Sequence, residues 1–178
     1  MPKVRETGGR IVNVAKALGK HIVDLHLTAE DGTCCICVPI KSNVYLPNGL
    51  NVPDFFNNLL TPFFYSQSYF EKRHTWPWGE YSHGLLGMLE WYDDTKTSGN
   101  EEVQFSILVR LRSSPDWPKY RSLLQAAGNI QGHQECICGS RRRFRDCHAS
   151  VFKGLWRLKR DVGPKGISAA LRILGKQN

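Results

Sequence analysis

The chain has 178 residues and a formal charge of +8, which is enough length for one ordinary domain and a small appendage. The charge is uneven, because residues 128–178 hold 11 Lys and Arg against 3 Asp and Glu. No apolar run approaches the ~20 residues that cross a bilayer, no secretory signal peptide is found, and the six cysteines are too closely clustered to bridge well. A membrane protein and a disulfide-stabilised secreted protein are therefore disfavoured, and a soluble, cytoplasmic protein is expected.

The amino-terminal end predicts short strands. A brief apolar alternation predicts a strand and a turn within residues 1–20. Residues 22–27 alternate apolar and polar side chains, which is typical of a half-buried strand. Asp31 and Gly32 then predict a turn.

Three cysteines follow that turn directly, at Cys34, Cys35 and Cys37. A buried strand is one interpretation, since free cysteine is among the most buried residue types. The others are extra metal ligation and a nucleophile presented after the turn. Ligation is the weakest, because no Cys or His group with matching spacing remains once the carboxyl-terminal cluster is complete. From these residues alone, burial is favoured over a nucleophile.

Residues 51–65 predict a helix that forms the main wall of the hydrophobic core. Large apolar side chains recur on one helical stripe, at Val52, Phe55, Phe56, Leu59, Leu60, Phe63 and Phe64. Pro53 lies near the start, where a helix tolerates it. Pro62 lies inside the pattern and predicts a kink or a division of the helix.

A polar and aromatic motif follows, with the sequence Trp76-Pro-Trp-Gly-Glu-Tyr-Ser-His-Gly84. Glu80 and His83 are three residues apart, so on a helical turn they would share a face. A carboxylate in that position can fix the tautomer of an imidazole and raise its basicity. The alternative is a helix-capping segment in which His83 satisfies a backbone carbonyl. Both interpretations stay open.

The rest of the chain predicts helices, over residues 85–92, 101–111, 119–127, 148–160 and 164–174. A capping box from Ser98 to Glu101 opens the second of these helices. Pro115 and Pro118 end it. Pro164 lies near the start of the last one.

Three thiols and an imidazole lie within thirteen residues of the tail, at Cys136, Cys138, Cys147 and His148. Three cysteines and one histidine form the closed tetrahedral set of structural zinc sites, with no position left open. Four unrelated polar residues or two disulfides are the alternatives. Adjacent Cys147 and His148 would then be costly buried polar groups, so the sequence predicts one structural Zn²⁺. Four arginines between the ligands would offset the thiolate charge and lower the thiol pKa values, at Arg141, Arg142, Arg143 and Arg145.

This spacing, Cys-x-Cys-Gly-Ser, six residues and Cys-His, resembles the SEC-C motif, a short zinc-binding module at the ends of many bacterial proteins. The match covers every ligand position of that motif.

The front of the chain resembles bacterial ubiquitin-conjugating-enzyme-like (UBC-like) proteins. Some of these accompany cGAS-like nucleotidyltransferases in anti-phage (CBASS) operons. The resemblance covers residues 1–112, and it rests on Gly8-Gly9-Arg10-Ile11, His26, residues 31–35, the helix start at Pro53 and residues 76–84. It implies an α+β class: a pared-down UBC-like fold of short antiparallel strands packed on helices. A linker with a short helix over residues 113–133 and a zinc module with helices over residues 134–178 would follow.

In that family a cysteine placed three residues after a glycine accepts a protein C-terminus as a thioester and passes it to an amine. Gly32 places this catalytic role on Cys35, with Cys34 and Cys37 as alternates. His83, with Glu80 behind it, would deprotonate the acceptor or the thiol. The His-Pro-Asn pattern of eukaryotic members is absent, so oxyanion support would come from another group.

Two functional hypotheses follow from the resemblance and the tail. The first is a thioester transferase of bacterial defence, for which the resemblance offers the C-terminus of a cGAS-like nucleotidyltransferase as a candidate protein substrate. The second is a non-catalytic, zinc-containing adaptor whose basic tail binds a protein partner or, less favoured, nucleic acid. A sheet with missing strands would expose an edge, which predicts partner binding or a homo-oligomer. No membrane partner is expected.

Overall fold

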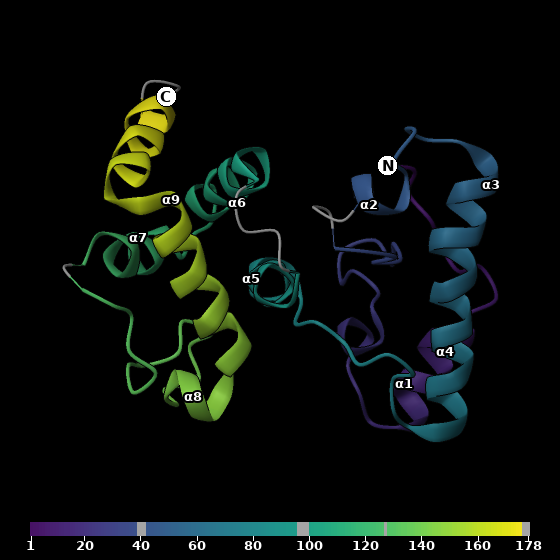
Figure 1. Cartoon of the computed structure of the whole chain (residues 1–178). Helices are drawn as coiled ribbons and strands as arrows, with labels where there is room; N and C mark the ends of the chain where they lie inside the picture. The colour runs from purple at the N-terminus through teal and green to yellow at the C-terminus, as the bar shows by residue number, and fades with distance from the viewer. Residues whose placement is uncertain (39–41, 96–99, 127, 176–178) are drawn as a thin grey trace. The chain divides into compact units, whose positions relative to one another are not determined.

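The computed structural model describes residues 1–38, 42–95, 100–126 and 128–175 (Figure 1). In these residues the chain forms helices and turns, and the only β-type pairing is a set of isolated backbone bridges. The predicted α+β fold of antiparallel strands packed on helices is therefore wrong. None of the described helices is long and apolar enough to cross a membrane.

The chain divides into two compact units, Met1–Glu80 and Tyr81–Asn178. The sequence-based division had placed its boundaries after residues 112 and 133 instead. Each unit contains its own buried apolar side chains, and the two are described separately below.

The first predicted strand is helix α1, Arg10–Ala17. The side chains of Ile11 and Ala15 are buried and four residues apart, so they lie on one face of a helix. The carboxylate of Glu6 accepts a hydrogen bond from the Ile11 N–H and so satisfies a donor of the first turn. The short apolar run thus fits a helical face better than an alternating strand.

The second predicted strand is the 3-10 helix η1, Ile22–Leu25. A capping box precedes it: the His21 ring accepts the Val23 N–H, and the Asp24 carboxylate accepts the His21 N–H. These local hydrogen bonds favour a helical turn over an extended ladder. The period-2 pattern was too short to outweigh them.

The turn predicted at Asp31 is present. The Thr28 N–H donates to the Thr33 carbonyl at 2.9 Å, and an antiparallel bridge joins Leu27 to Cys34. Hydrogen bonds from Thr33 and Thr28 hold the pKa of the Asp31 carboxyl well below its usual range. Hydrogen bonds to the Asp31 carboxylate therefore stabilise the turn. The turn places the cysteines beside residues 26 and 27.

The predicted long helix is divided, as Pro62 had indicated. After the short helix α2, Ser42–Tyr45, the chain forms helix α3, Val52–Phe55, a π-helical turn η3, Phe56–Leu60, and helix α4, Thr61–Arg73. Pro62 has no N–H, and its ring crowds the carbonyl four residues earlier. The wider π turn before it accommodates both effects.

Only part of the apolar stripe of this helix forms core. Phe55, Leu59 and Phe63 are buried, whereas three other members are exposed: Val52 at 71%, Phe56 at 54% and Phe64 at 37%. The prediction that the whole stripe is the core wall is wrong for these three side chains. The apolar stripe is wider than the part of the helix surface that the rest of the first unit covers.

The second unit contains five helices among its described residues: α5, Gly84–Asp94; α6, Glu101–Arg112; α7, Trp117–Gln125; α8, Phe144–Cys147; and α9, Ala149–Gly175. The helices predicted after residue 84 are confirmed. The last two predicted helices form α9 with a kink at Gly163. Ser98 of the predicted capping box lies outside the described residues, and the Asn100 side chain accepts the Val103 N–H instead.

Helix α9 organises the second unit because it packs on α5 and carries polar anchors for its neighbours. A Cβ atom at Gly154 would lie 1.9 Å from the Leu89 carbonyl oxygen, so the two helices approach closely there. The Lys159 ammonium donates to the carbonyls of Leu123, Ala126 and Gly128, and so binds the carboxyl-terminal end of α7. This packing fixes the start of α9, next to the cysteine cluster.

Candidate metal centre

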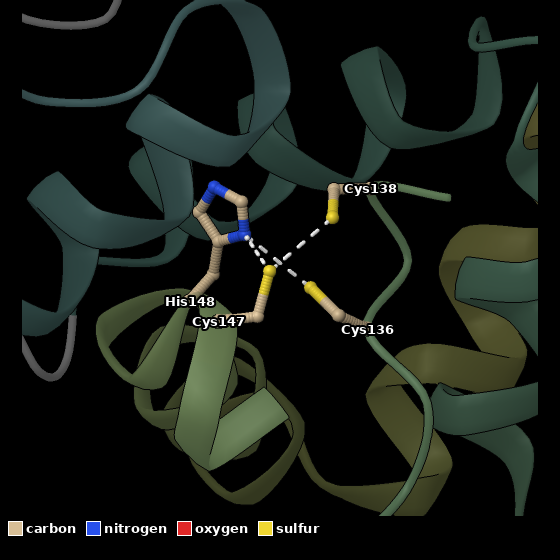
Figure 2. Close-up of side chains that lie close together, drawn as sticks. All are labelled: Cys136, Cys138, Cys147 and His148. Atoms are coloured by element: carbon tan, nitrogen blue, oxygen red, sulfur yellow. Dashed lines mark hydrogen bonds between the residues drawn. The ribbon is translucent and has the colours of Figure 1, made fainter. Parts of the chain in front are cut away.

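The four predicted metal ligands converge on one point of the second unit (Figure 2). Their ligand atoms all lie within 4.8 Å of one another. His148 Nδ1 is 3.4 Å from Cys136 Sγ and 3.2 Å from Cys147 Sγ, and Cys147 Sγ is 3.5 Å from Cys138 Sγ. All six cysteines of the chain are free, so the disulfide alternative does not apply to this arrangement.

These separations fit a tetrahedral zinc ion. With Zn–S bonds of about 2.3 Å and a Zn–N bond of about 2.0 Å, two sulfurs lie roughly 3.8 Å apart and a sulfur and a nitrogen roughly 3.5 Å apart. The three distances given above lie close to these edges. No pair of ligand atoms is more than 4.8 Å apart, so a shortening of at most about 1 Å is required, which side-chain rotation can supply. The site can therefore hold one divalent ion with four protein ligands.

A short backbone loop presents the first two cysteines. The Cys136 N–H donates to the Arg142 carbonyl at 2.8 Å, and the Phe144 N–H donates to the Gln134 carbonyl at 2.9 Å. Gly139 turns the chain between these bonds with φ of 81°, in the left-handed region that glycine adopts at little cost. The Cys-x-Cys-Gly pattern thus forms a tight turn. Residues 136–148, which hold the four ligands, are called the knuckle from here on.

The other two ligands come from the junction of helices α8 and α9. Cys147 ends α8, and His148 is the single residue that separates it from α9. Beneath them the Phe144 ring is fully buried and lies 6.1 Å from the Phe152 ring. This apolar contact anchors the short helix and fixes the positions of both ligands.

The thiols of the knuckle differ in acidity. Burial raises the pKa of Cys136 to about 12. Burial also acts on Cys138, but hydrogen bonds from Ser140 and from the neighbouring thiols outweigh it and lower its pKa to about 6. Ser140 Oγ lies 3.1 Å from Cys138 Sγ and 3.2 Å from Cys147 Sγ. A bound cation would supply the charge that the buried Cys136 thiolate needs.

The sequence motif includes Ser140 but does not by itself assign this residue a role at the metal site. Its hydroxyl also contacts two ligand sulfurs, and it accepts the Arg142 N–H at 3.3 Å. Its position directly after Cys-x-Cys-Gly was the available signal. Partners of this kind orient metal ligands and tune their charge.

The four arginines of the knuckle are all exposed. Two of them are held locally: the Arg142 guanidinium donates to the Asp146 carbonyl, and Arg145 Nε lies 3.7 Å from the Asp146 carboxylate. Within the part of the chain that the structure describes, Arg141 and Arg143 have no acidic partner. The knuckle therefore presents positive charge to solvent.

The cysteines of the first unit lie in three different environments. Cys34 is buried, Cys37 is half-buried with its sulfur 3.9 Å from Met1 Sδ, and Cys35 is exposed. The Cys35 N–H donates to the His26 carbonyl, which fixes the backbone at this position. Although the residue is exposed, atoms around the thiol exclude enough water to raise the pKa of Cys35. The interpretation as a buried residue therefore applies to Cys34, whereas the thiol of Cys35 is accessible.

The structure does not bring Glu80 and His83 together on a helical face, because the segment between them is not helical. Glu80 belongs to the first unit, where its carboxylate lies 4.0 Å from His26 Nε2. The His26 ring in turn packs edge-on against Trp76, with centroids 4.8 Å apart. His83 belongs to the second unit and takes the N-cap position of α5.

Glu90 anchors the segment at the start of α5. Its buried carboxylate accepts hydrogen bonds from the Ser82 N–H and the Ser82 hydroxyl. The motif thus lies at the start of α5, where His83 is the N-cap residue and Ser82 and Glu90 form hydrogen bonds. Sequence reasoning missed Glu90, whose only signal was a charge within an apolar helix.

Comparison of the chain with protein-family models, with curated proteins and with solved structures finds no match. The resemblances to the SEC-C motif and to UBC-like proteins therefore rest on the sequence motifs alone.

Proposed function

We propose that the protein is a zinc-containing binding module, in which one structural Zn²⁺ is held by Cys136, Cys138, Cys147 and His148. The observation that carries this proposal is the convergence of four zinc-type ligand atoms to within 4.8 Å of one another. Four protein ligands leave no open position for a substrate or an attacking water. The ion therefore stabilises the fold of the knuckle, and the protein surface around it binds the partner.

The surface that zinc orders is an anion-binding one in this proposal. The knuckle arginines are exposed, and Arg141 and Arg143 have no acidic partner among the described residues. Residues 128–178 carry most of the net positive charge of the chain. A partner with an acidic surface or with phosphates would meet this charge, which speeds encounter and fixes orientation.

Metal analysis of the purified chain tests the zinc site. We expect one zinc per chain, and loss of that zinc in Cys136→Ser, because removal of one ligand leaves an incomplete set around the ion. Cys35→Ser is the matched control, since it removes an exposed thiol of the first unit. Two or more zinc ions per chain, or full retention in Cys136→Ser, would refute the assignment.

A thioester transferase stays a prediction. The observation in its favour is the exposure of Cys35 after the turn at Asp31. With a candidate protein donor whose C-terminal carboxyl is activated as an adenylate or a thioester, a non-reducing gel would show a reducible adduct in the native chain, and Cys35→Ser would lack it. An adduct that persists in Cys35→Ser would remove this role from Cys35.

A further inference from the structure

An aromatic cluster lies on the surface of the first unit, and neither functional hypothesis uses it. It consists of Tyr65 and Tyr69 on helix α4 and Trp78 from the segment that follows the helix. Trp78 is 68% exposed and Tyr65 is 53% exposed. Large aromatic rings left in water at this level cost hydrophobic free energy, so their gathering at one place points to a ligand.

The rings of the cluster lie close together and are tilted toward one another. The centroids of Tyr65 and Tyr69 are 6.2 Å apart with 34° between planes, and those of Tyr65 and Trp78 are 5.5 Å apart with 31° between planes. Separations this short leave no room for another ring between them. A planar ligand would instead stack on an open ring face, as nucleobases do on aromatic side chains.

Basic side chains lie next to the aromatic cluster on the same face of helix α4. Residues three and four apart are neighbours on a helix, so Lys72 and Arg73 follow Tyr69 directly. Both side chains are exposed, and neither forms an ion pair with a described acidic residue. The nearby acid Glu71 is already paired with Arg10, with 2.6 Å between Oε2 and Nη2. Lys72 and Arg73, at the end of the cluster next to Tyr69, could therefore bind an anion.

We propose that the aromatic cluster, with Lys72 and Arg73, binds single-stranded nucleic acid. Bases stack on the open faces of Trp78 and the tyrosines, and backbone phosphates meet the two cations. Sequence preference is weak, because every base has a π face. A second copy of the chain fits less well, since a symmetric contact would bring the Lys72 and Arg73 cations of both copies together. The site does not depend on zinc.

Fluorescence anisotropy with a labelled twelve-nucleotide oligo-dT and the full-length zinc-loaded chain tests the proposal. We expect Trp78→Ala to weaken binding about tenfold or more, because one stacked base is lost. Trp78→Phe retains a ring and should restore part of the affinity. Phe56→Ala is the matched control: it removes an exposed ring of the same helical run that is outside the cluster, and it should bind as the native chain does.

Salt dependence separates stacking from phosphate contact. Arg73→Gln should lower the slope of log Kd against log salt by about 0.7, the value for one phosphate contact on a single strand. Trp78→Ala should leave that slope unchanged. Binding of oligo-dT that Trp78→Ala leaves intact would overturn the site and assign the contact to another surface. So would self-association that Trp78→Ala abolishes, since the cluster would then be an interface between copies.

Discussion

At the scale of single residues, the accessibility and the acidity of Cys35 point in opposite directions. Its residue is exposed, yet the pKa of its thiol is raised by desolvation. The thiolate is the attacking form, so a raised pKa leaves the group mostly protonated at neutral pH. A strong nucleophile would need a neighbouring cation or base to reverse this.

Alkylation with iodoacetamide over a range of pH checks this state. We expect the rate at Cys35, followed by mass spectrometry, to rise with pH through a midpoint above that of free cysteine, because burial raises the pKa of this thiol. Cys34, which is buried, should react more slowly at every pH. Fast modification of Cys35 near pH 7 would show an activated thiol and would favour the transferase hypothesis.

Single residues also show which site predictions succeed from sequence. The four zinc-type ligands could be predicted because their chemistry is rare and their spacing is local: all are within thirteen residues. The shared helical face expected for Glu80 and His83 could not, because it required a helical turn. The segment is not helical, and His26 approaches Glu80 from a distant part of the sequence.

At the scale of elements, the close approach of α5 and α9 depends on a missing side chain. Gly154→Ala would place a Cβ atom 1.9 Å from the Leu89 carbonyl oxygen, and the helices would have to separate. We expect a loss of roughly 3 kcal/mol in unfolding free energy, as overpacked cores show. Thermal unfolding followed by circular dichroism measures it.

Gly132→Ala is the control for this substitution. The nearest atom to an added Cβ at Gly132 is 3.5 Å away, an ordinary contact, and no positive φ applies there. An equal effect of both changes would show that the α5–α9 contact is looser than described.

The elements were predicted unevenly for a physical reason. The helices after residue 84 have long apolar periods and end signals, so they were found. The short apolar runs at the amino-terminal end fit either the helical or the strand period. Capping hydrogen bonds of Glu6, His21 and Asp24 stabilise helices there. The π turn before Pro62 was expected only as an interruption, because its geometry depends on packing that a pattern does not contain.

At the scale of the whole molecule, two cores imply two stability units. The first unit buries side chains such as Ile11, Leu25 and Phe70, and the second buries Trp91, Ile107 and Leu155. The expected boundary after residue 112 followed the motifs of the resemblance. The compact units instead divide within the motif at residues 76–84, where Glu80 ends one unit and Tyr81 begins the other.

Removal of zinc should therefore affect only one of the two units. The ligands all belong to Tyr81–Asn178, and binding of a structural zinc ion contributes directly to folding free energy. In hydrogen–deuterium exchange with excess EDTA, we expect peptides of Tyr81–Asn178 to lose protection while those of Met1–Glu80 keep it. Cys136→Ser without chelator should give the same pattern, and Cys35→Ser should not. Equal loss of protection along the whole chain would contradict two independent units, and unchanged protection in the knuckle peptides would contradict a structural ion.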